Sequence, residues 1–373
     1  ATSFLKFMGP YPALPLHFPS LSTSNQRAQN ETGISLDFIV DTAANTNTIN
    51  AQVAQELALE SVGSALPGYG AAGAIEGGET FSLGDCTFDR AGKRPQLQNN
   101  EDDDSSEDLD LFMTNLTASA LPIASPAAAG LLGVAFLNCF EGGVKFDWGG
   151  GIDARQPMIT FYGAASDDDG DGDNGNGRGI EERLKTMRRV PIHVLDDILL
   201  PSITMIINGA EIRALLDTGS PITVLNAAAA KVAGLTTIEL ETDRKGDGEE
   251  SERKGGFQNP FKKFGDNFKA AQVQAEAASR GDILVIGGMD GQRIELRRTN
   301  EKVSVSMDAT DVEGEDNGDQ VTFPSSYIYV GDLPGLVALD GLKGSSSPPA
   351  AILGMDVLKR LPAMVYRQNE VYF

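Results

Sequence analysis

The segment that decides the fold is Ala214-Leu215-Leu216-Asp217-Thr218-Gly219-Ser220. Three apolar residues precede a single aspartate, and a turn that contains a glycine follows it at once. A short apolar run of this kind is typical of a buried strand, which would carry the carboxyl group of Asp217 into the interior. Gly219 allows the backbone to fold tightly around that group. We therefore expect a buried acid at the end of a β-strand.

A related pattern lies 176 residues upstream, at Phe38-Ile39-Val40-Asp41-Thr42-Ala43-Ala44. The same offset aligns Gly33 with Gly209, Asn50-Ala51 with Asn226-Ala227, and Leu59 with Leu235. It also aligns Leu14-Pro15-Leu16-His17-Phe18 with Val190-Pro191-Ile192-His193-Val194, which makes the two histidines of the chain equivalent. We interpret both histidines as structural hydrogen-bonding residues. A series of matches in one register predicts an internal duplication.

A second pairing closes each copy, since residues 130–137 resemble residues 351–358. Strand-like residues follow at 158–162 and 371–373, and residues 203–207 and 212–216 flank the hairpin turn Asn208-Gly209. The alanine-rich residues 51–59 and 227–235 favour short helices. The pattern therefore predicts an all-β fold with minor helices.

With these residues in view, the chain resembles the aspartic peptidases, particularly the retropepsin-like ones. The resemblance rests on Asp217-Thr218-Gly219-Ser220 and, downstream, on Ile352-Leu353-Gly354. It implies two acid-protease-type β-barrel lobes related by internal duplication, with Asp41 and Asp217 as a catalytic pair. It also implies that Thr42, Thr218 and Gly219 support the two active-site loops.

The resemblance implies a two-lobed domain organisation, with a cleft between the lobes and a β-hairpin flap that covers it. We expect an N-terminal lobe with a degenerate motif at 10–165, an acidic Gly/Asp linker at 166–185, and a C-terminal lobe at 186–373. The linker holds the run 167–179, whose glycines and like charges are typical of a flexible segment. Residues 282–294 predict a hairpin flap with Gly288 and Met289 near its tip, and Tyr69 is the flap candidate of the first copy.

The first copy departs from the family pattern at two positions. Ala43 stands where the signature has glycine, and Ala135 stands where the second copy has Asp356. Two alternatives to a single-chain peptidase therefore stay open. One is an inactive, peptide-binding pseudopeptidase, and the other is a homodimeric peptidase that uses only the C-terminal lobe.

Composition limits the partners of this chain. The formal net charge of −23 argues against nucleic acids and anionic membrane surfaces as partners, because both require basic groups. The two cysteines, Cys86 and Cys139, lack metal-ligand spacing, and no register of the acidic run fits a calcium loop, so we expect no metal and no cofactor. We expect a peptide or protein substrate and a monomer, with a homodimer as the alternative. The low cysteine count favours an intracellular or organellar location over a secreted one.

Overall fold

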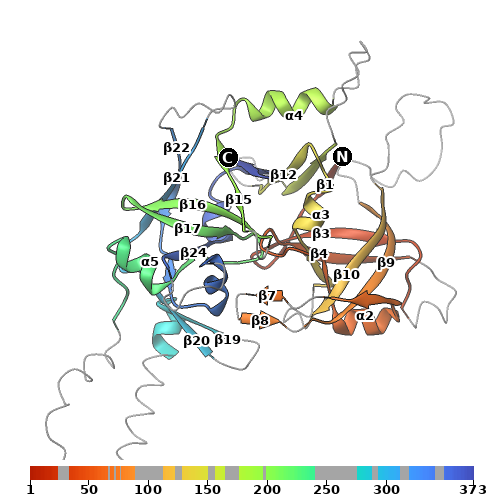
Figure 1. The fold of residues 1–373 in the computed structure, drawn as a ribbon, viewed down its shortest axis with the longest axis horizontal. Helices are drawn as coiled ribbons and strands as arrows, with labels where there is room; N and C mark the ends of the chain where they lie inside the picture. Colours follow the sequence, from red (N-terminus) through yellow and green to blue (C-terminus); the bar gives the residue numbers. More distant parts are fainter. Residues whose placement is uncertain are drawn as a thin grey trace, which may run out of the picture.

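The computed structural model describes residues 1–23, 33–65, 68–70, 73–75, 77–88, 112–121, 128–149, 156–163, 176–195, 199–239, 275–287, 293–310, 319–340 and 348–373. Strands dominate these residues and the helices are short, so the predicted all-β fold with minor helices is confirmed. Figure 1 shows the first half of the chain, red to yellow, on one side of the molecule and the second half, green to blue, on the other.

The first lobe is built on an eight-stranded sheet. In spatial order its strands are β2 (Lys6–Met8), β3 (Tyr11–Phe18), β4 (Ile34–Val40), β11 (Gly130–Leu132), β5 (Thr48–Asn50), β10 (Phe112–Leu121), β9 (Glu79–Phe88) and β6 (Ser61–Ser64). The helices α2 (Ala51–Leu57) and α3 (Val134–Leu137) follow β5 and β11. A separate hairpin consists of β7 (Gly68–Gly70) and β8 (Gly73–Ile75).

The second lobe is built on a ten-stranded sheet. Its main path runs through β19 (Ile283–Gly287), β20 (Arg293–Arg298), β23 (Tyr329–Val330), β18 (Val224–Leu225), β24 (Ala350–Leu353), β17 (Ala210–Leu216), β16 (Pro201–Ile207), β21 (Val303–Asp308) and β22 (Gln320–Ser326), while β15 (His193–Val194) pairs with β16. The helical segments α5 (Ala227–Val232), η2 (Pro334–Asp340) and α7 (Met355–Leu358) belong to this lobe.

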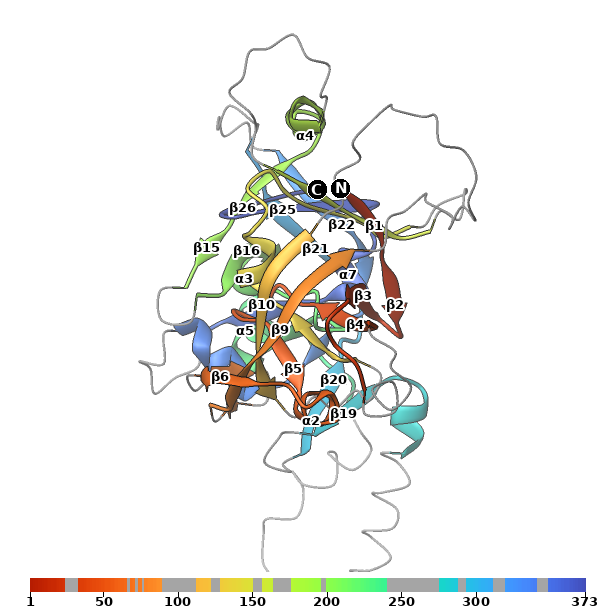
Figure 2. The same ribbon diagram turned by 90° about the vertical axis from the view of Figure 1, so that its right-hand side faces the viewer.

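A third sheet joins the two lobes. Its six strands are, in order, β1 (Thr2–Phe4), β13 (Met158–Tyr162), β12 (Gly143–Asp147), β25 (Ala363–Arg367), β26 (Glu370–Tyr372) and β14 (Arg189–Pro191). The junction is the antiparallel pair β12–β25, from Val144 opposite Tyr366 to Asp147 opposite Ala363. Both chain ends lie at this end of the molecule (Figure 2). One cluster of buried apolar side chains also runs through both lobes, so the lobes share a core as well as a sheet.

The expected linker is partly helical. The helix α4 (Asn176–Leu184) begins inside the Gly- and Asp-rich run. It buries Ile180 and Leu184 against Val365 and Tyr372 of the joining sheet. Apolar residues four apart lie on the same face of a helix, and burying that face stabilises a segment whose composition alone disfavours a helix.

Strand registers confirm part of the duplication and correct another part. The strands β4 and β17 are equivalent at the offset of 176, because Val40 and Leu216 pair in parallel with Leu132 and Leu353. The pairing of residues 130–137 with residues 351–358 is confirmed by the same contacts. Both helices predicted after β5 and β18 are present, and Asn50 and Asn226 cap them with their side chains.

The predicted equivalence of the two histidines is wrong. In β3, Ala13 lies opposite Ile39, whereas in β16 the residue opposite Leu215 is Ser202, so these strands correspond at an offset of 189. His193 lies in β15, opposite Ser202, and its counterpart in the first lobe is Lys6, opposite Ala13. The offset changes because 15 residues separate β3 from β4, whereas only Asn208 and Gly209 separate β16 from β17.

The two helix caps provide a matched test of packing. The side chain of Asn226 is buried, accepts from Ala229 N–H and Ala350 N–H, and donates to Pro348 C=O. Among the described residues, Asn50 accepts with its side chain from Gln52 N–H alone. We expect Asn50→Ala to lower the free energy of unfolding by about 1 kcal/mol. Asn226→Ala should lower it by about 3 kcal/mol, because it also leaves buried backbone groups without partners. Urea unfolding of both variants checks this, and equal losses would contradict the assigned contacts.

Candidate active site

Equivalent strands deliver Asp41 and Asp217 to the boundary between the lobes. Asp41 follows β4 and donates its N–H to Leu132 C=O of β11 at 2.9 Å. Asp217 follows β17 and donates its N–H to Leu353 C=O of β24 at 3.1 Å. Each aspartate therefore follows the last three residues of a strand, all of them buried, in a parallel strand pair. Each acid lies at the end of a buried strand because the residues before it are apolar and favour burial on both faces of the sheet.

The residue after each aspartate fastens the two loops together. The hydroxyl of Thr42 donates to Leu216 C=O at 2.6 Å and accepts from Thr218 N–H at 3.0 Å. The hydroxyl of Thr218 donates to Val40 C=O at 2.7 Å and accepts from Thr42 N–H at 3.1 Å. Both threonines are fully buried. These four bonds, which we call the threonine interlock, hold the two aspartates in a fixed relation across the lobe boundary.

The two carboxyl groups lie close enough for the charge of Asp41 to act on Asp217. Burial raises the pKa of both, and the charge of Asp41 raises the pKa of Asp217 further, so that it lies well above its usual value of 3.8. Hydrogen bonds from Ala43 N–H, from Asp217 and from Gly219 N–H lower the pKa of Asp41 and so partly offset its burial. Two acids this close cannot both be charged at low cost, so the pair holds one proton over a wide pH range. Hydrogen bonds from Gly219 N–H and Ser220 N–H also lower the pKa of Asp217, so the shared proton belongs to the pair.

Gly219 lies directly against the carboxyl group of the opposite lobe. A Cβ atom at this position would lie 2.3 Å from Cγ of Asp41 and 2.4 Å from its Oδ2. No side chain fits there without moving the carboxyl group, so the glycine is required by close approach. The sequence motif anticipated a glycine in this turn, but not that it touches the acid of the other copy.

The structure brings a third titratable group, Tyr11, to the pair. Continuing the β3–β4 register two places beyond Ala13 and Ile39 sets Tyr11 opposite Asp41, where antiparallel neighbours share one face of the sheet. Burial and the charges of Asp217 and Asp41 raise the pKa of its phenol, so the hydroxyl stays neutral and can donate a hydrogen bond. Sequence reasoning missed this residue because the offset of 176 does not apply to β3, so the register that sets Tyr11 opposite Asp41 could not be read from the repeat. At the correct offset of 189 the counterpart of Tyr11 is Leu200.

Two different arrangements support the active-site loops from behind. In the second lobe, Thr223 donates to Asp356 at 2.7 Å and accepts from Gly354 N–H at 3.0 Å. In the first lobe, Asn47 Oδ1 accepts from Gly133 N–H at 3.1 Å, which is the equivalent bond. The amide oxygen of Asn47 accepts this bond without the support of an acid such as Asp356, so the alanine at position 135 leaves the bond in place.

Of the three predicted flap residues, the structure describes Tyr69 but not Gly288 and Met289. Tyr69 lies in β7, and the hairpin β7–β8 contacts η2 of the second lobe. Gly288 and Met289 lie outside the described residues, in the connection between β19 and β20. These two strands form the predicted hairpin, with Ile283 opposite Arg297.

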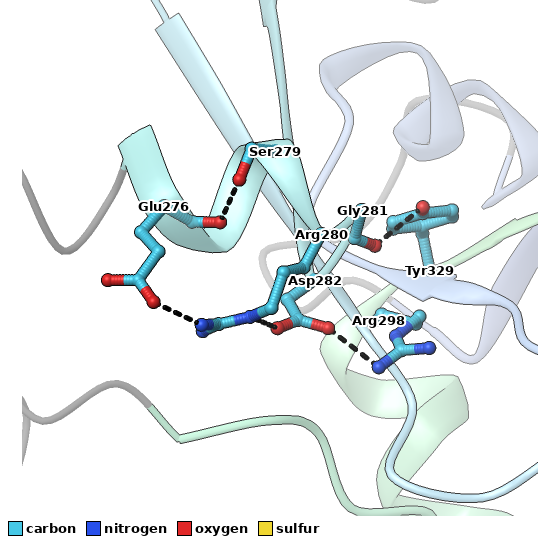
Figure 3. A network of polar contacts seen from close by, with 7 residues as sticks. All are labelled: Glu276, Ser279, Arg280, Gly281, Asp282, Arg298 and Tyr329. Atoms are coloured by element: carbon cyan, nitrogen blue, oxygen red, sulfur yellow. Dashed lines mark hydrogen bonds and ion pairs between the residues drawn. The ribbon is translucent and has the colours of Figure 1, made fainter.

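An ion-pair network fixes the base of that hairpin (Figure 3). The buried carboxyl group of Asp282 accepts from Arg280 at 2.9 Å and from Arg298 at 2.6 Å. Beside it, the hydroxyl of Tyr329 donates to Gly281 C=O at 2.9 Å. The network joins the start of β19 to β20 and β23, so the hairpin leaves the sheet from a rigid base.

The two cysteines do not belong to this site. Both are free thiols; Cys86 is buried in the first lobe and Cys139 is exposed after α3. Burial raises the pKa of the Cys86 thiol to about 11, which keeps it protonated and unreactive. In the part of the chain that the structure describes, no group of three or more His, Cys, Asp or Glu side chains is arranged to hold a metal ion.

Comparison with known proteins supports the assignment of the second lobe. Residues 203–290, which include most of β16, all of β17 and Asp217, match the family model of the aspartyl proteases. This lobe is similar to aspartyl proteases. The resemblance drawn from the sequence is thereby confirmed, and the aspartyl protease match supports a peptidase function. No curated protein matches the sequence.

Three solved structures match this chain over nearly its whole length. They are edgp (10% identity, TM-score 0.41, 99% of this chain and 96% of that chain), Basic 7S globulin from soybean (10%, 0.40, 97% and 94%) and the aspartic proteinase from Irpex lacteus (11%, 0.43, 100% and 96%). Membrane insertion by a helix finds no support, since every helix among the described residues is too short or too polar to span a bilayer.

The threonine interlock predicts a large loss of stability on removal of one hydroxyl. Thr42→Val keeps the shape of the side chain but leaves Leu216 C=O and Thr218 N–H buried without their partner. We expect the free energy of unfolding to fall by about 2–4 kcal/mol. Thr322→Val, on the exposed face of β22, is the matched control and should change it by less than about 0.5 kcal/mol. Chemical denaturation measures both, and similar values for the two variants would contradict the interlock.

The aspartate pair predicts how stability depends on pH. Because the pKa of Asp217 is raised on folding, the folded protein keeps this proton at pH values where the unfolded chain has lost it. Stability therefore decreases as pH rises from about 3.8 through the raised value. Asp217→Asn removes this loss, so its melting temperature should exceed that of the wild type at pH 7 but not at pH 3.5. The control is Asp37→Asn, at a surface carboxylate paired with Lys6. A difference that does not change with pH would refute the raised pKa.

Proposed function

We propose that this chain is an aspartic endopeptidase that hydrolyses peptide bonds with a water molecule activated by Asp41 and Asp217. The observation that carries the proposal is the threonine interlock, which holds two buried acids, one from each lobe, at the ends of equivalent strands beside each other. A buried acid pair that shares one proton supplies a base and an acid at the same place, which is what attack of water on an amide requires. The aspartyl protease match over residues 203–290 supports the same class of reaction.

The two carboxyl groups take distinct roles, one as base and one as acid, and we assign Asp41 as the charged member. Asp41 accepts a proton from water as the water oxygen bonds to the scissile carbonyl carbon. Asp217 gives its proton to the carbonyl oxygen, so that a neutral tetrahedral diol forms. The carbon–nitrogen bond then breaks as one diol proton returns to the pair and the amide nitrogen takes a proton from it. This leaves a carboxylic acid and an amine, and the pair again holds one proton.

Substrate recognition follows from the strands around the pair. An extended peptide binds through main-chain hydrogen bonds to strands and loops at the lobe boundary, a common mode of peptide recognition. The neutral hydroxyl of Tyr11 is available as a donor beside the pair. We propose the lobes, with boundaries at 10–165 and 186–373, as the two walls of this site and the segments at Tyr69 and at Gly288 and Met289 as its covers.

The decisive experiment compares two acid-to-amide variants. We expect Asp41→Asn and Asp217→Asn each to lower kcat/KM by on the order of 10²–10⁴-fold or more, because each removes one half of the acid–base pair. Asp37→Asn, the same chemical change at a half-buried position four residues before Asp41, should keep wild-type activity. Cleavage of a denatured protein substrate between pH 3 and 7 measures all three.

The outcomes separate the alternatives. Activity that survives Asp41→Asn but not Asp217→Asn would favour a homodimer that uses only the C-terminal lobe. Binding of the substrate without cleavage at any of these pH values would favour the pseudopeptidase, for which the alanines at 43 and 135 argue. Either result would overturn the single-chain enzyme.

A further inference from the structure

A tight turn fixes the position of Tyr11 beside the acid pair. Only Gly9 and Pro10 separate β2 from β3, and Gly9 has a φ of 64°, the positive value that the first central residue of such a hairpin turn requires. Met8 therefore pairs with Tyr11, the first residue of β3. Because the β3–β4 register also sets Tyr11 opposite Asp41, its phenol reaches the charges of both aspartates, one from each lobe.

The second lobe has no hydroxyl group at the equivalent position. At the offset of 189 that relates β3 to β16, Tyr11 corresponds to Leu200. The next residue is a proline in both lobes, Pro12 and Pro201, which supports this alignment. Leu200 also closes a hairpin, since its C=O accepts from Leu195 N–H at 3.0 Å. The two acids therefore have different neighbours, a phenol in the first lobe and an aliphatic side chain in the second.

The surroundings of Leu200 are apolar over a wider area. Its side chain is buried in an apolar cluster of the second lobe, against which Leu284 and Ile294 of the hairpin β19–β20 also pack. Tyr329 packs there as well, but its hydroxyl already donates to Gly281 C=O at 2.9 Å (Figure 3). The surface beside Leu200 is therefore aliphatic, and the hydroxyl of its tyrosine is occupied.

An extended peptide would present one side chain to each of these two surfaces. Successive side chains of an extended chain point to opposite sides. The scissile bond lies at the acid pair, and the two lobes are copies that supply one acid each. Of the two residues that the scissile bond joins, one would therefore face the first lobe and the other would face the second.

We propose that Tyr11 is a specificity-determining residue, whose hydroxyl donates a hydrogen bond to an uncharged amide side chain of the substrate, asparagine or glutamine, next to the scissile bond. The residue on the other side of that bond is aliphatic and packs toward the cluster around Leu200. The inference rests on the proposed function and names its substrate class, a peptide with an amide residue joined to an aliphatic one.

The charge of the acid pair selects the kind of acceptor. The phenol of Tyr11 stays neutral and able to donate, because burial and both aspartates raise its pKa. A carboxylate of the substrate could accept this bond, but it would lie beside the negative charge of a pair that holds one proton. An amide oxygen accepts the bond without a charge. A polar group of the site also discriminates against substrates that leave it unpaired.

Two isomeric peptides test this assignment. They are short and identical except for the central pair, which is Gln-Leu in one and Leu-Gln in the other. We expect the wild type to cleave one isomer at the central bond with a kcat/KM about tenfold higher than the other, because only one isomer places its amide against Tyr11. The favoured isomer identifies which residue of the scissile pair faces the first lobe. In Tyr11→Phe, which removes the hydroxyl alone, the ratio should fall to about one.

Tyr162→Phe is the matched control, since it removes a hydroxyl from the joining sheet, where that group accepts from Arg183. It should keep the wild-type ratio. Tyr11→Leu gives the first lobe the residue of the second and should also lower the ratio to about one. A ratio near one in the wild type, or a ratio that persists in Tyr11→Phe, would overturn the role of Tyr11, while cleavage itself would leave the peptidase intact.

Binding measures the same preference without turnover. Isothermal titration calorimetry of Asp217→Asn, with and without Tyr11→Phe, gives the Kd of both isomers, and we expect a ratio of about ten that Tyr11→Phe removes. If the wild type cleaves neither the peptides nor a denatured protein, the proposed function fails, and these Kd values still decide the role of Tyr11. Equal Kd values for the two isomers while Tyr11 is present, or binding of neither isomer, would refute that role.

Discussion

The architecture depends on the reciprocal hydrogen bonds between Thr42 and Thr218. Each hydroxyl satisfies a backbone carbonyl and a backbone N–H of the other lobe, in a region that water does not reach. Because the four bonds form together or leave buried groups without partners, the two aspartate loops have one stable arrangement. That arrangement brings two acids into contact, which neither lobe would do alone.

The joining sheet makes this contact possible within one chain. Its central pair, β12 and β25, links the lobes by backbone hydrogen bonds, and α4 covers Val365 and Tyr372 beside it. The lobes are therefore fixed at two places, at the sheet and at the threonine interlock. Two separated attachments restrict rotation of one lobe against the other, so the distance between the carboxyl groups is set by the scaffold and not by the acids, which repel when both are charged.

Much of this could be predicted from the sequence because the informative signals are local. The apolar run before Asp217, the turn at Asn208 and the capping residue Asn226 each determine their own conformation within a few residues. The register upstream of Asp41 could not be predicted, because the connection between β3 and β4 is longer than its counterpart and a fixed offset cannot absorb that change. Tyr11 was hidden for this reason. The helix α4 was missed because its stability comes from packing on the joining sheet, which composition does not record.

The first copy has lost residues of the motif, but it has not lost the hydrogen bonds that those residues would make. Where the first lobe lacks an equivalent of Asp356, Asn47 makes the bond to Gly133 N–H that Thr223 makes to Gly354 N–H. The bonds of Thr42 are retained in full. Ala43, the other departure of the first copy, still donates its N–H to Asp41 at 2.8 Å. The first lobe therefore keeps the bonds that position its acid, because those bonds need a backbone N–H and a hydroxyl or amide oxygen and not an exact repeat of the second copy.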